Sequence, residues 1–335
     1  MSLPTRKIGK DDVPYPGLGT MGMSGWYAGF GDTERNIATL KAAWEKGCRF
    51  WDTADIYGDK RMWENEELIS QVMKECNIPR KDIFLATKFG NWQREDGSRV
   101  IVGTPEYVKE ACDRSLKALG TDYIDLYYQH RVDKNTPIED TMQAMKELQS
   151  AGKIRYIGLS ECSAATLRRA CAVVKVDALQ VEYSLWETSP ETNGLFDACK
   201  ELGVAFVAYS PLGRGLISGS VRSRKDLTPD DNRWKHPRFS EENFPKNVEL
   251  VEELAKLAAA KGVTSAQLAI AWVHAQWDGI LAIPGTTRIE RLEENLDSLK
   301  VHFTPEELAE IRKILDSFPR AGTRYPEAMM RDVHI

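Results

Sequence analysis

The stretch CRFWDTADIYGDKRMWENEELISQVMKE, residues 48–75, joins a short β-rich run to an amphipathic helical pattern. Cys48–Ala54 is typical of a buried strand, and Glu64–Glu75 has the apolar spacing of a helix. From Arg49 onward such units repeat, which favours a parallel sheet with helical returns. The count of candidate strands is eight: Tyr15–Thr20, Cys48–Ala54, Ile83–Lys88, Tyr123–His130, Ile154–Ser160, Ala178–Tyr183, Val204–Ser210 and Ile280–Ile283.

Eight parallel strands with returning helices close into a (β/α)8 barrel, the TIM barrel. The expected helices are 33–46, 64–75, 104–119, 137–150, 164–173, 190–201, 246–260, 265–276, 289–298 and 305–316. The last two are extra helices after the eighth strand, and a long irregular loop, 211–245, follows the seventh. Two leading strands around residues 9–12 are expected to cover the bottom of the barrel. Length alone allows one or two domains, and the barrel favours a single domain over residues 1–335.

Composition excludes several classes of protein. The formal net charge of −5 and the absence of a basic cluster argue against nucleic acid as a partner. No apolar stretch approaches the length that spans a bilayer, and no targeting segment is evident at the N-terminus. The six cysteines form no Cys-x-x-Cys pair, which suits reduced thiols in the cytoplasm. The composition does not determine the oligomeric state.

The run Gly17-Leu18-Gly19-Thr20-Met21-Gly22 matches the G-x-G-x-x-G dinucleotide fingerprint. A Rossmann fingerprint must open a helix, and here a glycine-broken aromatic loop, 24–31, follows instead. We therefore reject the Rossmann interpretation. The glycines are expected to let the backbone approach a ligand at the end of the first strand.

Four ionisable side chains follow consecutive strands where barrel enzymes keep their chemistry. Asp52, Lys88 and His130 end the second, third and fourth strands, and Tyr57 lies five residues beyond Asp52. Lys88, kept charged by Asp52, is expected to lower the pKa of Tyr57 and make it a proton donor. His130 would orient a carbonyl oxygen, so the set suits reduction of an aldehyde or ketone.

Each residue also has a purely structural interpretation. Asp52 and Lys88 taken alone could form a structural ion pair, and His130 could be an ordinary core histidine. A metal-dependent hydrolase is disfavoured, because only one of the five histidines ends a strand. We predict no metal site.

With these residues the chain resembles the aldo-keto reductases over nearly its full length, and it is most similar to the branch that includes pyridoxal reductases. The resemblance implies a bound NADPH and an enzyme that reduces small carbonyl substrates to alcohols. Ser160 and Gln180 would bind the carboxamide, and Tyr209 would stack on the nicotinamide. The other cofactor contacts implied are Gly19, Thr20, Met21, Asp52, Ser210, Pro211, Leu212, Gly213, Arg214, Pro284, Gly285, Thr286, Thr287, Arg288, Glu294 and Asn295.

NADPH is favoured over NADH because Thr286, Thr287 and Arg288 precede a helix N-terminus and together suit a 2′-phosphate. Glu161 departs from the asparagine of many relatives, yet its carboxylate could still accept from the carboxamide. Residues 59–63 look like an insertion.

The substrate pocket is expected to contain Trp26, Tyr27, Trp92 and Arg131. Arg131 replaces an aromatic residue of many relatives, so the pocket combines apolar walls with one cation and suits polar or anionic aldehydes. The alternative function is a nucleotide-binding regulatory subunit, similar to potassium-channel β-subunits, with little turnover. Nothing near the N-terminus resembles a channel-blocking extension, which favours the enzyme.

Overall fold

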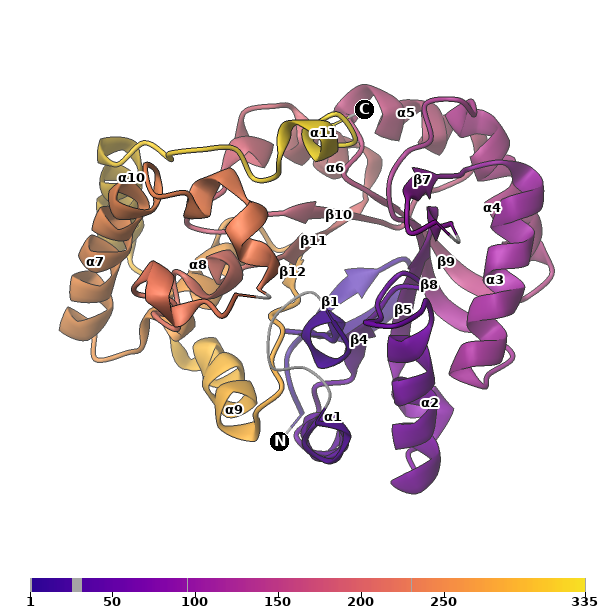
Figure 1. Cartoon of the computed structure of the whole chain (residues 1–335), viewed down its shortest axis with the longest axis horizontal. Helices are drawn as coiled ribbons and strands as arrows, with labels where there is room; N and C mark the ends of the chain where they lie inside the picture. The colour runs from indigo at the N-terminus through magenta and orange to yellow at the C-terminus, as the bar shows by residue number, and fades with distance from the viewer. Residues whose placement is uncertain (1, 26–31, 95, 230, 335) are drawn as a thin grey trace.

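The computed structural model describes residues 2–25, 32–94, 96–229 and 231–334. Its centre is a sheet of eight strands whose neighbouring strands all pair in parallel (Figure 1). Their order around the sheet is β3 (Leu18–Gly19), β4 (Phe50–Asp52), β5 (Phe84–Phe89), β8 (Ile124–Gln129), β9 (Ile154–Ser160), β10 (Ala178–Glu182), β11 (Ala205–Tyr209) and β12 (Ile280–Ala282). The eight predicted strands and the barrel are confirmed; several strands are one to four residues shorter than predicted.

The barrel closes between its first and last strands. The amide of Gly17 donates to the carbonyl of Ala282 at 2.9 Å, and that of Gly19 donates to Pro284 at 3.2 Å. A Cβ on Gly19 would lie 2.9 Å from the Ile283 carbonyl oxygen, and one on Gly17 would lie 2.7 Å from the Phe50 ring. Close backbone approach at this seam therefore requires glycine. Our expectation named ligand approach as the reason, and it missed the seam.

The helices surround the barrel. They are α1 (Thr33–Glu45), α2 (Glu64–Glu75), α3 (Pro105–Leu119), α4 (Ile138–Ser150), α5 (Ala164–Val173), α6 (Leu195–Leu202), α7 (Phe244–Ala260), α8 (Ser265–Ala275), α9 (Ile289–Asp297), α10 (Pro305–Ser317) and α11 (Glu327–Met330).

Local signals explain most helix ends. The Thr104 hydroxyl accepts from the Tyr107 amide at the start of α3, and Gly120 ends that helix in the left-handed conformation. The prediction of a helix over 190–201 is wrong at its start. A short 3-10 turn, Ser189–Glu191, comes first, and Gly194 with φ 83° separates it from α6.

The N-terminal hairpin covers the bottom of the barrel, as predicted. It consists of β1 (Thr5–Ile8) and β2 (Asp11–Pro14), which pair antiparallel. Ile8 and Val13 of the hairpin are buried in one cluster with Phe50 and Phe84, at the starts of β4 and β5. Hairpin and barrel interior thus share one apolar core, and the opposite end of the barrel remains for the site.

Three segments lie over that opposite end. The first is a hairpin after β5, made of β6 (Asn91–Gln93) and β7 (Arg99–Ile101). The second is the loop 211–245, which contains four short 3-10 turns. The third is the segment after α10, which runs back across the molecule to α11 (Figure 1). Only the loop was predicted. Among the described residues, no helix has the length and apolarity needed to cross a membrane.

Candidate active site

A cavity of about 390 Å³ lies at the carboxyl ends of the strands. Most of the predicted site residues line it. These are Gly19, Thr20, Met21, Asp52, Tyr57, His130, Arg131, Ser160, Gln180, Tyr209, Ser210, Pro211, Leu212, Arg214, Pro284, Gly285, Thr286, Thr287, Arg288, Glu294 and Asn295. The cavity therefore reaches from the expected catalytic residues to the start of α9.

Lys88, Gly213 and Trp92 do not line the cavity. Lys88 is fully buried behind its wall, and Gly213 is buried within the loop 211–245. Trp92 is a correction: its ring packs against Trp63 and Tyr107, at centroid distances of 6.2 and 6.0 Å, instead of facing the cavity. The predicted pocket residues Trp26 and Tyr27 lie outside the described residues.

The four expected catalytic residues meet at the mouth of the barrel. Lys88 on β5 forms an ion pair with Asp52 at the end of β4, and its Nζ also donates to the Thr53 carbonyl at 2.7 Å. The same Nζ lies 3.4 Å from the Tyr57 hydroxyl. The His130 ring, just after β8, stands edge-on to Tyr57 with centroids 5.8 Å apart. Phenol, ammonium, carboxylate and imidazole thus form one contact group.

The protonation of Tyr57 differs from the prediction. Burial raises the pKa of its hydroxyl well above the usual value, the Asp52 carboxylate adds to that rise, and Arg131 opposes it. The expected net lowering by Lys88 is therefore wrong. Tyr57 instead holds its proton at neutral pH, with the Lys88 side chain 3.4 Å from its hydroxyl oxygen.

His130 is neutral in this environment. Burial lowers the pKa of its imidazole well below the usual value, and the neighbouring Arg131 and Lys88 charges lower it further. A neutral imidazole has one N–H donor and cannot compete with Tyr57 as a cationic acid. It suits the task of orienting a carbonyl oxygen.

Two residues expected near the nicotinamide carboxamide have other partners in this structure. The Gln180 amide donates to Asp52 at 2.8 Å, and the Ser160 hydroxyl accepts from Arg131 at 3.3 Å. Both remain on the cavity wall.

Glu161 does not face the cavity, which corrects the expectation that it accepts from the carboxamide. It adopts the left-handed conformation, with φ 56°, and both of its oxygens bind the Arg324 guanidinium at 2.8 and 2.9 Å. The Tyr209 hydroxyl and the Glu182 amide donate to the same carboxylate. Burial alone would raise the pKa of Glu161, but Arg324 outweighs it and the pKa falls to about 2. Glu161 therefore anchors the C-terminal segment.

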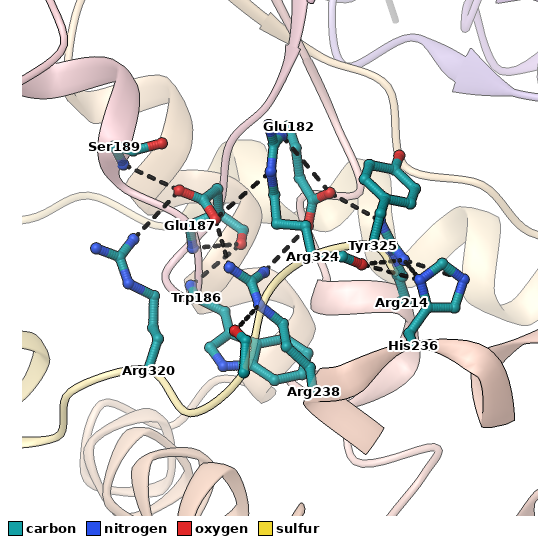
Figure 2. Close-up of polar contacts among 12 residues, drawn as sticks. Glu182, Trp186, Glu187, Ser189, Arg214, His236, Arg238, Arg320, Arg324 and Tyr325 are labelled. Atoms are coloured by element: carbon teal, nitrogen blue, oxygen red, sulfur yellow. Dashed lines mark hydrogen bonds and ion pairs between the residues drawn. The ribbon is translucent and has the colours of Figure 1, made fainter. Parts of the chain in front are cut away.

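The anchor extends into a buried network of arginines and glutamates (Figure 2). Arg214, from the loop, donates to Glu182 at 2.9 Å, and Arg238, from the same loop, donates to Glu182 at 3.3 Å and also binds Glu187. Arg324 approaches Glu182 at 3.9 Å. The network joins β10, the loop 211–245 and the C-terminal segment. Arg214, expected at the pyrophosphate, is thus already paired with Glu182.

The far end of the cavity is more open. Arg288 is exposed and stands directly before α9, and Thr286 accepts from its backbone amide at 3.1 Å. Glu294 pairs with Arg291 at 2.5 Å, while Asn295 is buried on the wall. Hydroxyls, a guanidinium and a helix N-terminus occur together here, as a phosphate site requires.

The lining residues that sequence reasoning missed include Asn91, Arg99, Tyr325 and Met329. The first two lie on the β6–β7 hairpin, which the dipeptide Asp96-Gly97 between two short runs could have indicated. Tyr325 and Met329 belong to the C-terminal segment, for which the sequence offers no periodic signal.

The chain is similar to known reductases over nearly its full length. A model of the family described as "Aldo/keto reductase family" matches residues 17–316. The aldo-keto reductase yakc of Schizosaccharomyces pombe, whose name specifies NADP(+), is 48% identical over 97% of this chain and 95% of its own. The aldo-keto reductase str7 of Strobilurus tenacellus is 46% identical over the same shares.

Solved structures are similar as well. A glycerol dehydrogenase from Gluconobacter oxydans superposes with a TM-score of 0.84 at 26% identity, covering 97% of this chain and 100% of its own. An aldo-keto reductase from Klebsiella pneumoniae, solved with NADPH, superposes with a TM-score of 0.72 at 27% identity, covering 97% and 99%.

Proposed function

This chain belongs to the Aldo/keto reductase family, and from that premise we propose that it reduces aldehydes, and some ketones, to alcohols with NADPH. The observation that carries the proposal is the contact group of Asp52, Tyr57, Lys88 and His130 at the mouth of the barrel. The family relationship supports carbonyl reduction in general, and the contact group supplies the acid that this reaction needs.

The cavity fits a nicotinamide dinucleotide. Its lining runs from Tyr57 and His130 to Thr286, Arg288 and Asn295, so one elongated ligand can contact both ends. The donors before α9 suit a 2′-phosphate, which favours NADPH over NADH. The yeast relative's name specifies NADP(+), and the Klebsiella enzyme was solved with NADPH. When bound, NADPH supplies the hydride that reaches the carbonyl carbon.

The protein's own groups handle the proton. Tyr57 gives its hydroxyl proton to the carbonyl oxygen, which becomes the alcohol oxygen. Lys88, 3.4 Å from the Tyr57 oxygen, stabilises the phenolate that forms. Asp52 holds Lys88 in place and balances its charge, and neutral His130 donates a hydrogen bond that orients the carbonyl.

The remaining cofactor contacts are proposed on the same basis. Ser160 and Gln180 would turn from their present partners to the carboxamide, and Tyr209 would stack on the nicotinamide. Pairing with Glu182 makes Arg214 a rigid wall of the pyrophosphate region, so we assign pyrophosphate binding to the backbone of residues 210–212 and not to the Arg214 guanidinium.

The test is turnover. Purified protein should oxidise NADPH when aromatic aldehydes are added, and NADH should be used far less well. Tight NADPH binding without turnover of any aldehyde would contradict the proposal and favour a nucleotide-binding regulatory subunit. A preference for NADH would contradict the assignment of the 2′-phosphate site alone.

A further inference from the structure

Arg99 and Arg131, on the cavity wall, have no ion-pair partner among the residues that the structure describes. Arg131 follows His130 after β8, and Arg99 begins β7 in the hairpin after β5. Arg131 is buried, while Arg99 is exposed at the cavity mouth. Burying a cation without a counter-ion is costly, so Arg131 with a second unpaired cation beside it indicates a place for an anion.

Within the described part of the chain, the acceptors that hold the Arg131 guanidinium are neutral. It is buried, and its Nη1 donates to the His130 carbonyl at 2.6 Å and to the Ser160 hydroxyl at 3.3 Å. The charge of Glu161 acts on it from a distance, but both Glu161 oxygens bind Arg324. The Glu161 charge therefore stabilises the Arg131 cation from a distance, but no described carboxylate binds the guanidinium directly.

Arg99 is held in the same way. Its Nε donates at 3.0 Å to the side-chain oxygen of Asn91, a neutral acceptor, and Nη2 donates to the same oxygen. Partial burial and the nearby Arg131 charge lower the pKa of Arg99 to about 10. The two cations therefore repel each other.

The side-chain amide of Asn91 contributes a further hydrogen-bond donor to this part of the cavity. The residue is 1% exposed, it lines the cavity, and its amide nitrogen has no hydrogen-bond partner among the described residues. A buried N–H donor without a partner costs free energy that a bound acceptor would recover.

We propose that Arg99, Arg131 and Asn91 form a subsite for an oxyanion, a carboxylate or phosphate, carried on the aldehyde substrate. This inference rests on the proposed function, because it names the class of substrate that the reductase site takes. An oxyanion would accept charge-assisted hydrogen bonds from the guanidiniums and relieve their repulsion. Since His130 and Arg131 are adjacent residues, the anion would lie only a short distance from the carbonyl that His130 orients.

The experiment compares aldehydes that differ in charge at one position. para-Carboxybenzaldehyde and para-formylphenyl phosphate are the charged probes, and para-carbamoylbenzaldehyde is the neutral one. The amide withdraws electrons more strongly than the carboxylate, so intrinsic reactivity favours the neutral probe. We expect the wild-type kcat/KM to favour at least one charged probe by about 10-fold or more, the scale of one charged hydrogen bond.

Substitutions of the two arginines test whether they cause the preference for charged aldehydes. Arg99→Met and Arg131→Met should each bring the ratio of kcat/KM for the charged probe to kcat/KM for the neutral probe close to one, whatever their effect on the neutral probe alone, and Arg99→Lys should keep part of the preference. Arg94→Met is the matched control, because Arg94 is exposed near the same hairpin and does not line the cavity. Equal losses for charged and neutral probes would mean that the arginines are structural, and would overturn the proposal.

A binding measurement does not depend on turnover, so it tests the anion subsite independently of the proposed reductase activity. Calorimetry with the NADP+-loaded protein should show that para-(hydroxymethyl)benzoate binds more tightly than its amide, and that Arg99→Met removes the difference. If no aldehyde is reduced, the proposed function fails while calorimetry still decides on the subsite. If aldehydes are reduced without charge preference and the two alcohols bind equally, only the subsite fails.

Discussion

At the scale of single residues, the two groups that we propose act on the carbonyl keep fixed protonation states around neutral pH. The pKa of His130 lies well below its usual value and that of Tyr57 well above its own, chiefly because both side chains are buried. The imidazole is therefore neutral above its lowered pKa, and the phenol is protonated below its raised pKa.

This predicts a flat pH profile. Between about pH 6 and pH 9, which spans the reference histidine value, kcat/KM for aldehyde reduction should change by less than about 3-fold. The measurement is initial rate against pH at low aldehyde and saturating NADPH. A step with a midpoint near the ordinary histidine value would mean that His130 titrates, contrary to this account.

Residue types and their order predicted the contact group, but they did not predict its electrostatics. Asp52, Lys88 and His130 could be placed because each ends a strand, and strand ends of a barrel meet. Whether Lys88 or burial dominates the pKa of Tyr57 depends on how much water reaches the phenol. That quantity comes from packing, so the sequence-based expectation had the wrong sign.

At the scale of elements, the C-terminal segment is held to the barrel by Arg324 and Glu161. The side chains are 4% and 0% exposed, and the two are joined by two hydrogen bonds. Removing one member of a buried ion pair leaves the other charge uncompensated.

Arg324→Met should therefore lower the free energy of unfolding by about 3–5 kcal/mol. Urea unfolding measures the loss. The double variant Glu161→Gln/Arg324→Met should recover part of it, because it leaves no buried charge at position 161. Arg331→Met removes an exposed pair from the same segment and should change stability by less than about 1 kcal/mol. Equal losses for Arg324→Met and Arg331→Met would contradict the anchoring role.

Elements with a repeating pattern could be predicted, and those without one could not. The strands and the helices α1 to α5 follow apolar periodicity, caps and glycine ends. The segment 318–334 has no such period, because its order comes from side chains such as Arg324 that reach distant glutamates. The β6–β7 hairpin was partly predictable. The dipeptide Asp96-Gly97 indicates a turn, but each flanking strand is too short to show an alternating apolar pattern.

At the scale of the whole molecule, the barrel depends on its seam between β3 and β12. A Cβ at Gly17 would lie 2.7 Å from the Phe50 ring and 2.9 Å from the Phe50 carbonyl oxygen. Backbone atoms can move little here, because Gly17 also donates to Ala282 across the seam.

Gly17→Ala should destabilise the fold by about 1–3 kcal/mol through overpacking. The expected signature is a lower urea midpoint with an unchanged slope, since the surface exposed on unfolding stays the same. A change within about 0.5 kcal/mol, as is usual for surface substitutions, would show that the packing of Gly17 against Phe50 of β4 tolerates a methyl group.

The count of eight strands predicted the architecture correctly, since that number of parallel strands closes with few alternatives. The seam itself could not be predicted, because it joins residues more than two hundred positions apart. The glycines of the first strand were therefore explained by a ligand alone, whereas Gly19 both lines the cavity and approaches the Ile283 carbonyl across the seam.

The most direct measurement of the central claim is the rate of NADPH oxidation by Tyr57→Phe with a saturating aromatic aldehyde, alongside NADPH affinity by fluorescence. Tyr127→Phe is the control, since Tyr127 is fully buried away from the cavity and its hydroxyl has no partner among the described residues. We predict that Tyr57→Phe binds NADPH normally and turns over about 100-fold to 10,000-fold more slowly, while Tyr127→Phe keeps its rate. A near wild-type rate for Tyr57→Phe would contradict the account.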